Sequence, residues 1–290
     1  MNISMNSDKL ILGTVQFGLS YGINNQNGKP DTDHVFQMLD YSINHGITEL
    51  DTADAYGDAQ EIIGKYHNQS NFTFKINTKF RKSDISLKEQ FKFTCNSLNI
   101  ENINVNNIHS FNDFMNYPEL SDELKEIKHK GLINHIGISI YDNKEFLSAI
   151  ESEFIDVIQF PYNLLDNRSH RSELISLAKS KGKKLHARSI FLQGLFFKNI
   201  DTITGSLKNL IPELHQIRKI SENINVPIAA LAFKYVYDTI EIDNILFGSE
   251  NIEQLQNNLE LKAYRIPKEA YMEINQIKVE DEELLYPKNW

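Results

Sequence analysis

The amino-acid sequence predicts one α/β domain folded as a closed (β/α)8 TIM barrel. Short apolar segments alternate with helical patterns along almost the whole chain, and the alternation repeats eight times. No polar linker divides the 290 residues, and barrels of this type are typically about 250 residues long. We therefore expect a single barrel domain over residues 1–290, with a C-terminal tail from about residue 263.

The strands are predicted from short apolar segments, each followed by a helical pattern. In chain order they occupy residues 10–14, 48–52, 72–79, 103–109, 135–140, 157–160, 184–189 and 244–247. A doubly wound sheet is the competing arrangement, but it requires a G-x-G-x-x-G phosphate loop after its first strand. Residues 13–18 read Gly-Thr-Val-Gln-Phe-Gly and lack that spacing, which favours the barrel.

The helices are predicted from apolar periodicity and from signals at their ends. In chain order they occupy residues 32–44, 58–66, 86–98, 117–130, 143–150, 171–181, 212–223, 228–238 and 252–261. Val35 and Leu39 recur at helical spacing in the first. Ser86 and Glu89 match a capping box in the third, and Gly131 closes the fourth. The tail shows no assignable strand, and we expect it to lie over one end of the barrel.

Composition and charge exclude several classes of function. The net charge of −9 offers no general attraction to nucleic acid. The single cysteine, Cys95, excludes an internal disulfide and a thiolate zinc site, and we predict no metal site. No segment reaches the roughly 18 apolar residues of a membrane span, and residues 1–7 lack the features of a signal peptide. These observations predict a cytoplasmic protein with no membrane or nucleic-acid partner.

Four reactive side chains stand at or just after the ends of three consecutive predicted strands. Asp51 ends the second strand, and Tyr56 follows it in the next loop. Lys79 ends the third strand and His109 the fourth. In a (β/α)8 barrel the working groups lie at the carboxyl ends of the strands, and neighbouring strands are about 4.8 Å apart. We therefore expect the four side chains to converge.

These residue types together can donate a proton to a carbonyl oxygen. A free tyrosine has a pKa near 10, and a nearby ammonium lowers it by stabilising the phenolate. A carboxylate such as Asp51 would hold the ammonium of Lys79 in place, and His109 would orient the carbonyl oxygen. Taken singly, each residue also has a common structural role, and Lys75 or Arg81 are rivals for the role of ammonium. Their joint placement favours catalysis.

The chain resembles the aldo-keto reductase family from residue 10 to about residue 261. The segment Leu-Asp-Thr-Ala-Asp-Ala-Tyr-Gly at 50–57 matches the family signature around its catalytic Asp and Tyr. Lys79 and His109 match the catalytic Lys and His. The resemblance implies a (β/α)8 barrel that binds NADPH, less often NADH, across its rim. Hydride would pass to a carbonyl carbon while Tyr56 protonates the oxygen.

The resemblance also implies a set of cofactor-binding residues. Ser139 and Gln159 match residues that hold the carboxamide, although Ile140 replaces the asparagine that follows the serine in the family. Arg188 stands where an aromatic ring often stacks on the nicotinamide, and a guanidinium plane can stack in its place. The remaining positions near the nicotinamide and the pyrophosphate are Gly13, Thr14, Ser189, Gln193 and Gly194.

The loop after the eighth strand differs from the family at the adenosine end. Gly248, Ser249 and Gln254 offer amides and a hydroxyl at a helix start, and Asn257 and Asn258 match adenine contacts. The family commonly has a Lys or Arg here for the 2′-phosphate of NADPH. This chain has Glu250, which would repel a phosphate but could accept from a ribose hydroxyl. On balance the resemblance favours NADP(H) slightly over NAD(H).

The substrate is expected to be a small carbonyl compound bound by the first and fourth loops and the tail. Phe17, Tyr21 and Phe111 are the candidate substrate residues, with Trp290 as a further possibility. The polar run Asn24-Asn25-Gln26-Asn27 suggests a sugar-like substrate. The long connection at 191–211 is a candidate lid, and a monomer or a homodimer is expected.

Two other functions share the same residues. The first is a regulatory or scaffold protein that binds a nicotinamide cofactor with little turnover, which would not need all four reactive groups. The second is a Schiff-base lyase in which Lys79 is the nucleophile, which requires the amine to be neutral and away from Asp51.

Overall fold

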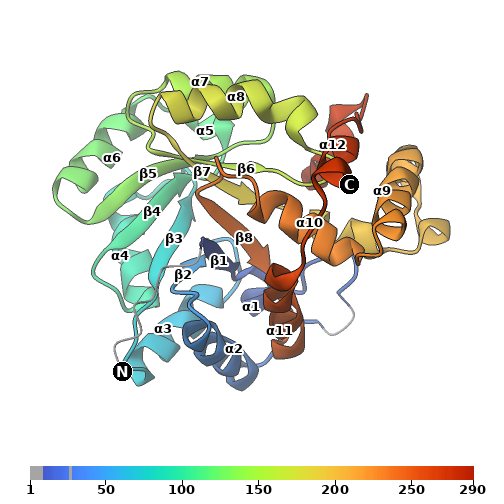
Figure 1. Ribbon diagram of the computed structural model, residues 1–290. Coiled ribbons are helices and arrows are strands. Elements are labelled where there is room, and N and C mark those ends of the chain that lie inside the picture. Colours follow the sequence, from blue (N-terminus) through green and yellow to red (C-terminus); the bar gives the residue numbers. More distant parts are fainter. Residues whose placement is uncertain (1–8, 26–27) are drawn as a thin grey trace.

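The computed structural model describes residues 9–25 and 28–290 and contains a closed barrel of eight parallel strands (Figure 1). The strands pair in chain order, and the last pairs with the first. They are β1 (Leu10–Gly13), β2 (Glu49–Asp51), β3 (Lys75–Phe80), β4 (Ile103–Ile108), β5 (Ile133–Ser139), β6 (Val157–Pro161), β7 (Lys184–Arg188) and β8 (Asn244–Gly248). The predicted single-domain barrel is therefore confirmed. Outside the described residues lie residues 1–7, for which the sequence predicts no signal peptide, and also Gln26 and Asn27.

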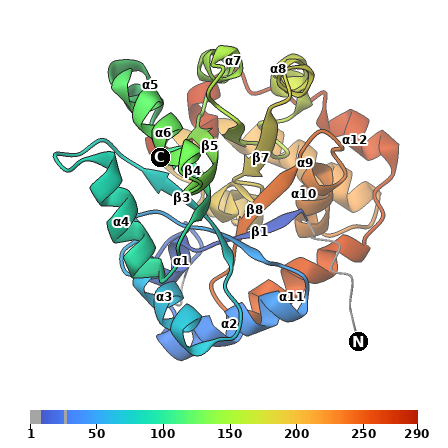
Figure 2. The same cartoon turned by 90° about the vertical axis from the view of Figure 1, so that its left-hand side faces the viewer.

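Helices surround the barrel, as Figures 1 and 2 show from two directions. They are α1 (Val15–Gly18), α2 (Thr32–Asn44), α3 (Ala59–Gln69), α4 (Leu87–Leu98), α5 (Phe111–Asn116), α6 (Glu119–His129), α7 (Asn143–Glu151), α8 (Arg168–Ser180), α9 (Ile211–Asn223), α10 (Ile228–Tyr237), α11 (Ile252–Glu260) and α12 (Lys268–Ile274). Short 3-10 turns occupy Leu192–Phe197, Ile200–Thr202, Gly205–Leu210, Leu261–Ala263, Glu282–Leu285 and Pro287–Asn289. None of the helices in the described residues is long and apolar enough to cross a membrane.

Most helix boundaries agree with the sequence prediction. The capping box at the start of α4 is present, because Ser86 accepts from the backbone N–H of Glu89 and the Glu89 side chain accepts from that of Ser86. The short helix α5 was not predicted, since only six residues separate its cap from the next turn. Its start is stabilised by the Ser110 hydroxyl, which accepts from the N–H groups of Asn112 and Asp113.

The strand register aims the predicted reactive residues at the carboxyl end of the barrel. Gly13 of β1 is paired with Asp51 on one side and with Gly248 on the other. Asp51 is paired in turn with Asn77, and Lys79 lies two residues further along β3. Side chains two residues apart on a strand share a face, so Lys79 points the same way as Asn77 but one layer closer to the carboxyl rim.

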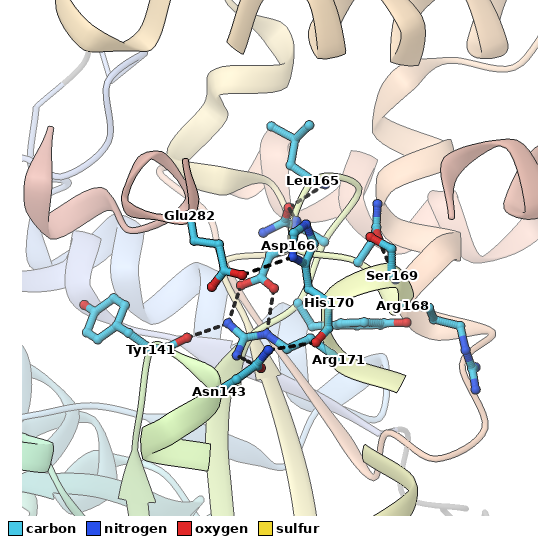
Figure 3. A network of polar contacts seen from close by, with 12 residues as sticks. Tyr141, Asn143, Leu165, Asp166, Arg168, Ser169, His170, Arg171 and Glu282 are labelled. Carbon is cyan, nitrogen blue, oxygen red and sulfur yellow. Dashed lines mark hydrogen bonds and ion pairs between the residues drawn. The ribbon is translucent and has the colours of Figure 1, made fainter. Parts of the chain in front are cut away.

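A buried ion pair supports the loop against which the C-terminal tail packs (Figure 3). The guanidinium of Arg171, on α8, donates to both carboxylate oxygens of Asp166 at 2.7 Å, and both side chains are almost fully buried. Arg171 also donates to the carbonyl of Tyr141 and to the Asn143 side chain. Tyr141 meets the tail residue Tyr286 edge to face. The pair therefore fixes the loop after β5, against which the tail packs.

Replacing Arg171 with Met should destabilise the protein strongly. The variant leaves Asp166 buried without its counter-ion, which costs about 3–5 kcal/mol in comparable sites. Arg168→Met, on the same helix, is the matched control. Its partner Glu241 is partly exposed, so we expect a loss of at most about 1 kcal/mol. Urea unfolding of both variants measures the difference, and equal stabilities would show that the buried pair contributes little.

Candidate active site

A cavity of about 940 Å³ opens at the carboxyl ends of the strands. This volume lies within the range of small-molecule and cofactor sites, about 300–1,000 Å³. The cavity is lined by most of the residues predicted from the sequence: Gly13, Thr14, Tyr21, Asp51, Tyr56, Lys79, His109, Phe111, Ser139, Gln159, Arg188, Ser189, Gln193, Gly194, Gly248, Gln254 and Asn258.

Four candidate site residues do not line this cavity, and one of them, Trp290, instead donates its indole N–H to the carbonyl of Leu284 at 3.0 Å. Phe17 was predicted to contact substrate, but it lies on α1 and is fully buried in the hydrophobic core. Ser249 was predicted to bind the cofactor, but it is fully buried and its hydroxyl accepts from Asn258 at 3.2 Å. Asn257 is exposed on α11 outside the cavity, because successive helical residues point about 100° apart and Asn258 takes the inward position.

Asp51 and Lys79 form a buried ion pair at the floor of the cavity. The second carboxylate oxygen of Asp51 accepts from Gln159 Nε2 at 2.9 Å, which holds it in place. Burial alone would lower the pKa of Lys79, but the Asp51 carboxylate, together with the neighbouring Tyr56, outweighs burial and raises it. Lys79 is therefore a charged ammonium at neutral pH. The rival cation Lys75 begins β3 at the opposite end of the barrel and pairs with Glu49.

Tyr56 lies above this pair on the loop that leaves β2. The Lys79 ammonium is 5.0 Å from the centroid of the Tyr56 ring. Two glycines allow the loop to fold this closely: a Cβ on Gly18 would meet the carbonyl of Tyr56 at 1.7 Å, and Gly57 has a positive φ of 57°. The backbone of this segment therefore sets the phenol beside the ammonium.

His109 is held as a neutral imidazole by its surroundings. Burial lowers its pKa to about 3, and the positive charges of Lys79, Arg81 and Arg188 add to the effect. The Arg81 side chain donates from Nε to His109 Nδ1 at 3.0 Å. An arginine can only donate, so Nδ1 is the acceptor and the imidazole proton is on Nε2. His109 can thus offer one N–H to a bound carbonyl oxygen.

The pH dependence of activity should show no break from His109 between pH 5 and 8. With its pKa lowered to about 3, the imidazole gains a proton only well below this range. A pH profile of kcat/KM for the wild type and for His109→Gln measures this, with nitrogen NMR of the histidines as a control for the tautomer. A break near pH 6 that disappears in the variant would contradict it.

Two polar groups lie beside the ion pair, and one of them has an atom without a partner in the described structure. Gln159 is fully buried and donates to Asp51, but its Oε1 has no hydrogen bond. Ser139 is the last residue of β5, lines the cavity nearby and is almost fully buried. An acceptor and a hydroxyl at neighbouring strand ends fit a carboxamide, so these residues suit a nicotinamide ring. Ile140, which replaces the expected asparagine, is fully buried and accepts from Arg188 through its carbonyl at 2.9 Å.

The loops after β1 and β7 are joined across the cavity mouth. Gln193 Nε2 donates to the hydroxyl of Tyr21 at 2.8 Å, and Asn24 Nδ2 donates to the carbonyl of Gly194 at 2.7 Å. Gln193 has a φ of 53°, which a residue with a side chain rarely adopts. Strained backbone of this kind is concentrated at functional sites, and here it turns the loop toward its partner.

The loop between β8 and α11 forms the opposite end of the cavity. The Gln254 side chain accepts from the backbone N–H of Glu250 at 2.6 Å, and Asn251 caps the helix by accepting from the N–H of Gln254 at 2.8 Å. The backbone amide of Gln254, one of the groups expected to bind an anion, is therefore already used, and so is that of Glu250. Glu250 lines the cavity, and burial raises its pKa.

Several cavity residues were missed or misjudged from the sequence, and three of them carry the electrostatics described below. Tyr141, Lys288 and Arg81 all line the cavity. Arg188 and Lys288 each lie 4.3 Å from the centroid of the Tyr141 ring. The sequence does not indicate that Lys288 lies at the site, because nothing in it places the tail beside β5. The position of Arg81, two residues after Lys79, indicates that it lies near the site. The sequence, however, suggests it only as an alternative to Lys79 for the cation beside the phenol.

Comparison with known proteins agrees with this geometry. The model of the aldo/keto reductase family matches residues 9–279. The uncharacterized oxidoreductase YqkF of Bacillus subtilis is 24% identical, over 86% of this chain and 89% of that protein. D-arabinose 1-dehydrogenase of Saccharomyces cerevisiae is 23% identical, over 83% and 79%.

Solved structures show the same fold. The aldo-keto reductase AKR11C1 of Bacillus halodurans superposes with a TM-score of 0.76 at 20% identity, covering 94% of each chain. The glycerol dehydrogenase AKR11B4 of Gluconobacter oxydans gives a TM-score of 0.73 at 19% identity, covering 93% of this chain and 90% of that one. With a family match over nearly the whole length, the chain belongs to the aldo/keto reductase family and is an oxidoreductase that acts on carbonyl or alcohol groups.

Proposed function

We propose that this protein reduces an aldehyde or ketone with a nicotinamide cofactor and that Tyr56 donates the proton to the carbonyl oxygen. The observation that carries the proposal is the buried Asp51–Lys79 pair, whose ammonium faces the Tyr56 ring at 5.0 Å. A fixed positive charge stabilises the phenolate that forms when the proton leaves. Asp51 keeps the ammonium charged and in position.

The remaining residues bind and orient. A bound dihydronicotinamide supplies the hydride. Gln159 Oε1 and the Ser139 hydroxyl are the groups that would hold its carboxamide, since both lie beside the ion pair and the former has no partner in the described structure. The Nε2–H of His109 would donate to the carbonyl oxygen and direct it toward Tyr56. The joined loops at Tyr21 and Gln193 would limit the access of water.

The charge state of Lys79 argues against a Schiff-base lyase. A covalent amine must be neutral to attack a carbonyl, whereas the pKa of Lys79 is raised, after the opposing effect of burial, by Asp51 and Tyr56. Oxidation of NADPH or NADH in the presence of a simple aldehyde tests the proposal. A protein that bound the cofactor without consuming it would instead be a binder, and trapping of a substrate by borohydride would indicate the lyase.

We propose that the substrate is polyhydroxylated. The first loop places Tyr21 and Asn24 at the cavity, and both are polar. Among the relatives, one is named for D-arabinose and another for glycerol. A comparison of kcat/KM for a short hydroxyaldehyde and for an alkyl aldehyde of equal length measures the preference.

Glu250 should decide the choice between the two nicotinamide cofactors. The slight preference for NADP(H) rested on the resemblance, but the β8–α11 loop brings only this charged side chain to the cavity within the described residues. On charge alone NAD(H) fits better, because a carboxylate repels the 2′-phosphate. Glu250→Arg should raise the affinity for NADPH relative to NADH by about tenfold or more.

Fluorescence titration of both cofactors measures this ratio, and Glu253→Arg on the exposed side of α11 is the matched control. An unchanged ratio in Glu250→Arg would show that the 2′-phosphate binds elsewhere.

A further inference from the structure

The cavity carries basic side chains that the proposed proton transfer does not use. At the end formed after β3 and by the tail, Arg81 and Lys288 both line the cavity and are exposed. Neither forms an ion pair with a carboxylate within the described parts of the chain. The opposite end, after β8, carries Glu250 instead. Arg81, which follows β3, is therefore separated by β1 and β2 from the β8–α11 loop expected to hold the adenosine.

Most hydrogen-bond donors of the Arg81 guanidinium are unused in the described structure. Its Nε–H is taken by His109 Nδ1 at 3.0 Å. A guanidinium has five N–H groups, and the four on its terminal nitrogens make no hydrogen bond in the described structure. They are the donors that pair with both oxygens of a carboxylate or phosphate. The residue thus reaches His109 with one edge and leaves the other for a ligand.

Two acidic groups, Asp113 and Glu145, also line this end of the cavity, but in the described residues neither forms an ion pair with Arg81 or Lys288. Asp113 accepts from the backbone N–H of Lys82 at 3.2 Å, and Glu145 accepts from that of Tyr141. The Lys82 ammonium has its own partner in Glu119 at 3.6 Å, so its charge is compensated. Within the described residues neither Arg81 nor Lys288 lies within ion-pair distance of a carboxylate, although Arg81 acts electrostatically on Asp54.

A second guanidinium, that of Arg188, acts electrostatically on the His109 imidazole. Arg188 influences the His109 imidazole together with Arg81, and it is held by the carbonyl of Ile140 at 2.9 Å and by the Tyr141 ring. Lys288 lies over that same ring at 4.3 Å. A ligand beside His109 is therefore near the positive charges of Lys79, Arg81 and Arg188, although the whole chain has a net charge of −9.

We propose that the carbonyl substrate carries an oxyanion group, a carboxylate or a phosphate ester, which Arg81 binds beside His109 while Lys288 adds a second positive charge. The inference rests on the proposed reductase function and names its substrate class. Local basic groups in a cleft attract an anion even when the net charge of the protein is negative. The Nε contact to His109 couples the bound anion to the residue that orients the carbonyl.

Three matched aldehydes test this: 4-carboxybenzaldehyde, its neutral methyl ester, and 4-formylphenyl phosphate. We expect the wild type to favour one or both anions over the ester by about tenfold or more in kcat/KM, the size of a charge-assisted hydrogen bond. The faster anion identifies the group as carboxylate or phosphate. Raising the salt concentration should reduce the preference.

Variants separate substrate binding from the effect on His109. Arg81→Gln should lower reduction of every aldehyde, because it releases the imidazole, but the ratio of anion to ester should also fall to near unity. Lys288→Gln should lower the ratio by a smaller factor, mainly through KM. The matched control is Arg265→Gln, an exposed arginine outside the cavity, which should preserve the ratio.

The outcomes are distinct. An ester reduced as fast as both anions, or a ratio that survives in Arg81→Gln, would overturn the inference while leaving the reductase function intact. Failure to reduce all three aldehydes with either cofactor would overturn the proposed function, and the substrate class would fall with it.

Discussion

Tyr56→Phe is expected to lower kcat by about 10²-fold or more while changing cofactor affinity by less than about threefold. The substitution removes only the hydroxyl, so the ring still covers the Lys79 ammonium at 5.0 Å from its centroid. The proton that must reach the carbonyl oxygen would then have to come from water. Binding of the cofactor should change little, because the carboxamide contacts are assigned to Ser139 and Gln159.

Steady-state reduction of an aldehyde and a fluorescence titration of the cofactor measure the two quantities. Tyr264→Phe, a partly exposed tyrosine outside the cavity, is the matched control and should retain full activity. Full activity in Tyr56→Phe would remove this phenol from the mechanism.

Lys79→Met should lower both activity and stability. The substitution removes the charge that stabilises the phenolate, and we expect a loss in kcat of about 10²-fold or more. It also leaves the Asp51 carboxylate buried, with only Gln159 donating to it. Uncompensated buried charges of this kind cost about 3–5 kcal/mol, so the variant should unfold at a lower urea concentration.

A double variant separates the two effects. In Lys79→Met with Asp51→Asn the buried negative charge is gone, so most of the lost stability should return while activity remains low. If stability and activity returned together, Lys79 would act only through the fold. If the single variant kept wild-type turnover, the ammonium would have no part in proton transfer.

The barrel was predictable because its signals are local and repeated. Each strand is a short apolar segment, and helices such as α2 and α4 carry both periodicity and caps. The position of a reactive residue at a strand end then follows from the fold, since all parallel strands deliver their carboxyl ends to one rim. Asp51, Lys79 and His109 could therefore be placed together before the structure was known.

The errors concern contacts that the chain order does not determine. Phe17 follows β1 directly, but the single turn of α1 directs its ring into the core rather than the cavity. The sequence assigns Arg81 no role beside His109, because the hydrogen bond between them joins the loops after β3 and β4 and depends on side-chain conformation. Lys288 lies almost 150 residues after Tyr141, and only the packing of the tail brings them together.

The most direct test of the central claim is the solvent deuterium isotope effect on single-turnover reduction of an aldehyde at saturating cofactor. If the Tyr56 hydroxyl delivers its proton as hydride moves, the wild type should react more slowly in D2O than in H2O, and Tyr56→Phe should react more slowly than the wild type by about 10²-fold or more in either solvent. Wild-type and variant enzymes that react at the same rate, with the same isotope effect, would contradict the account.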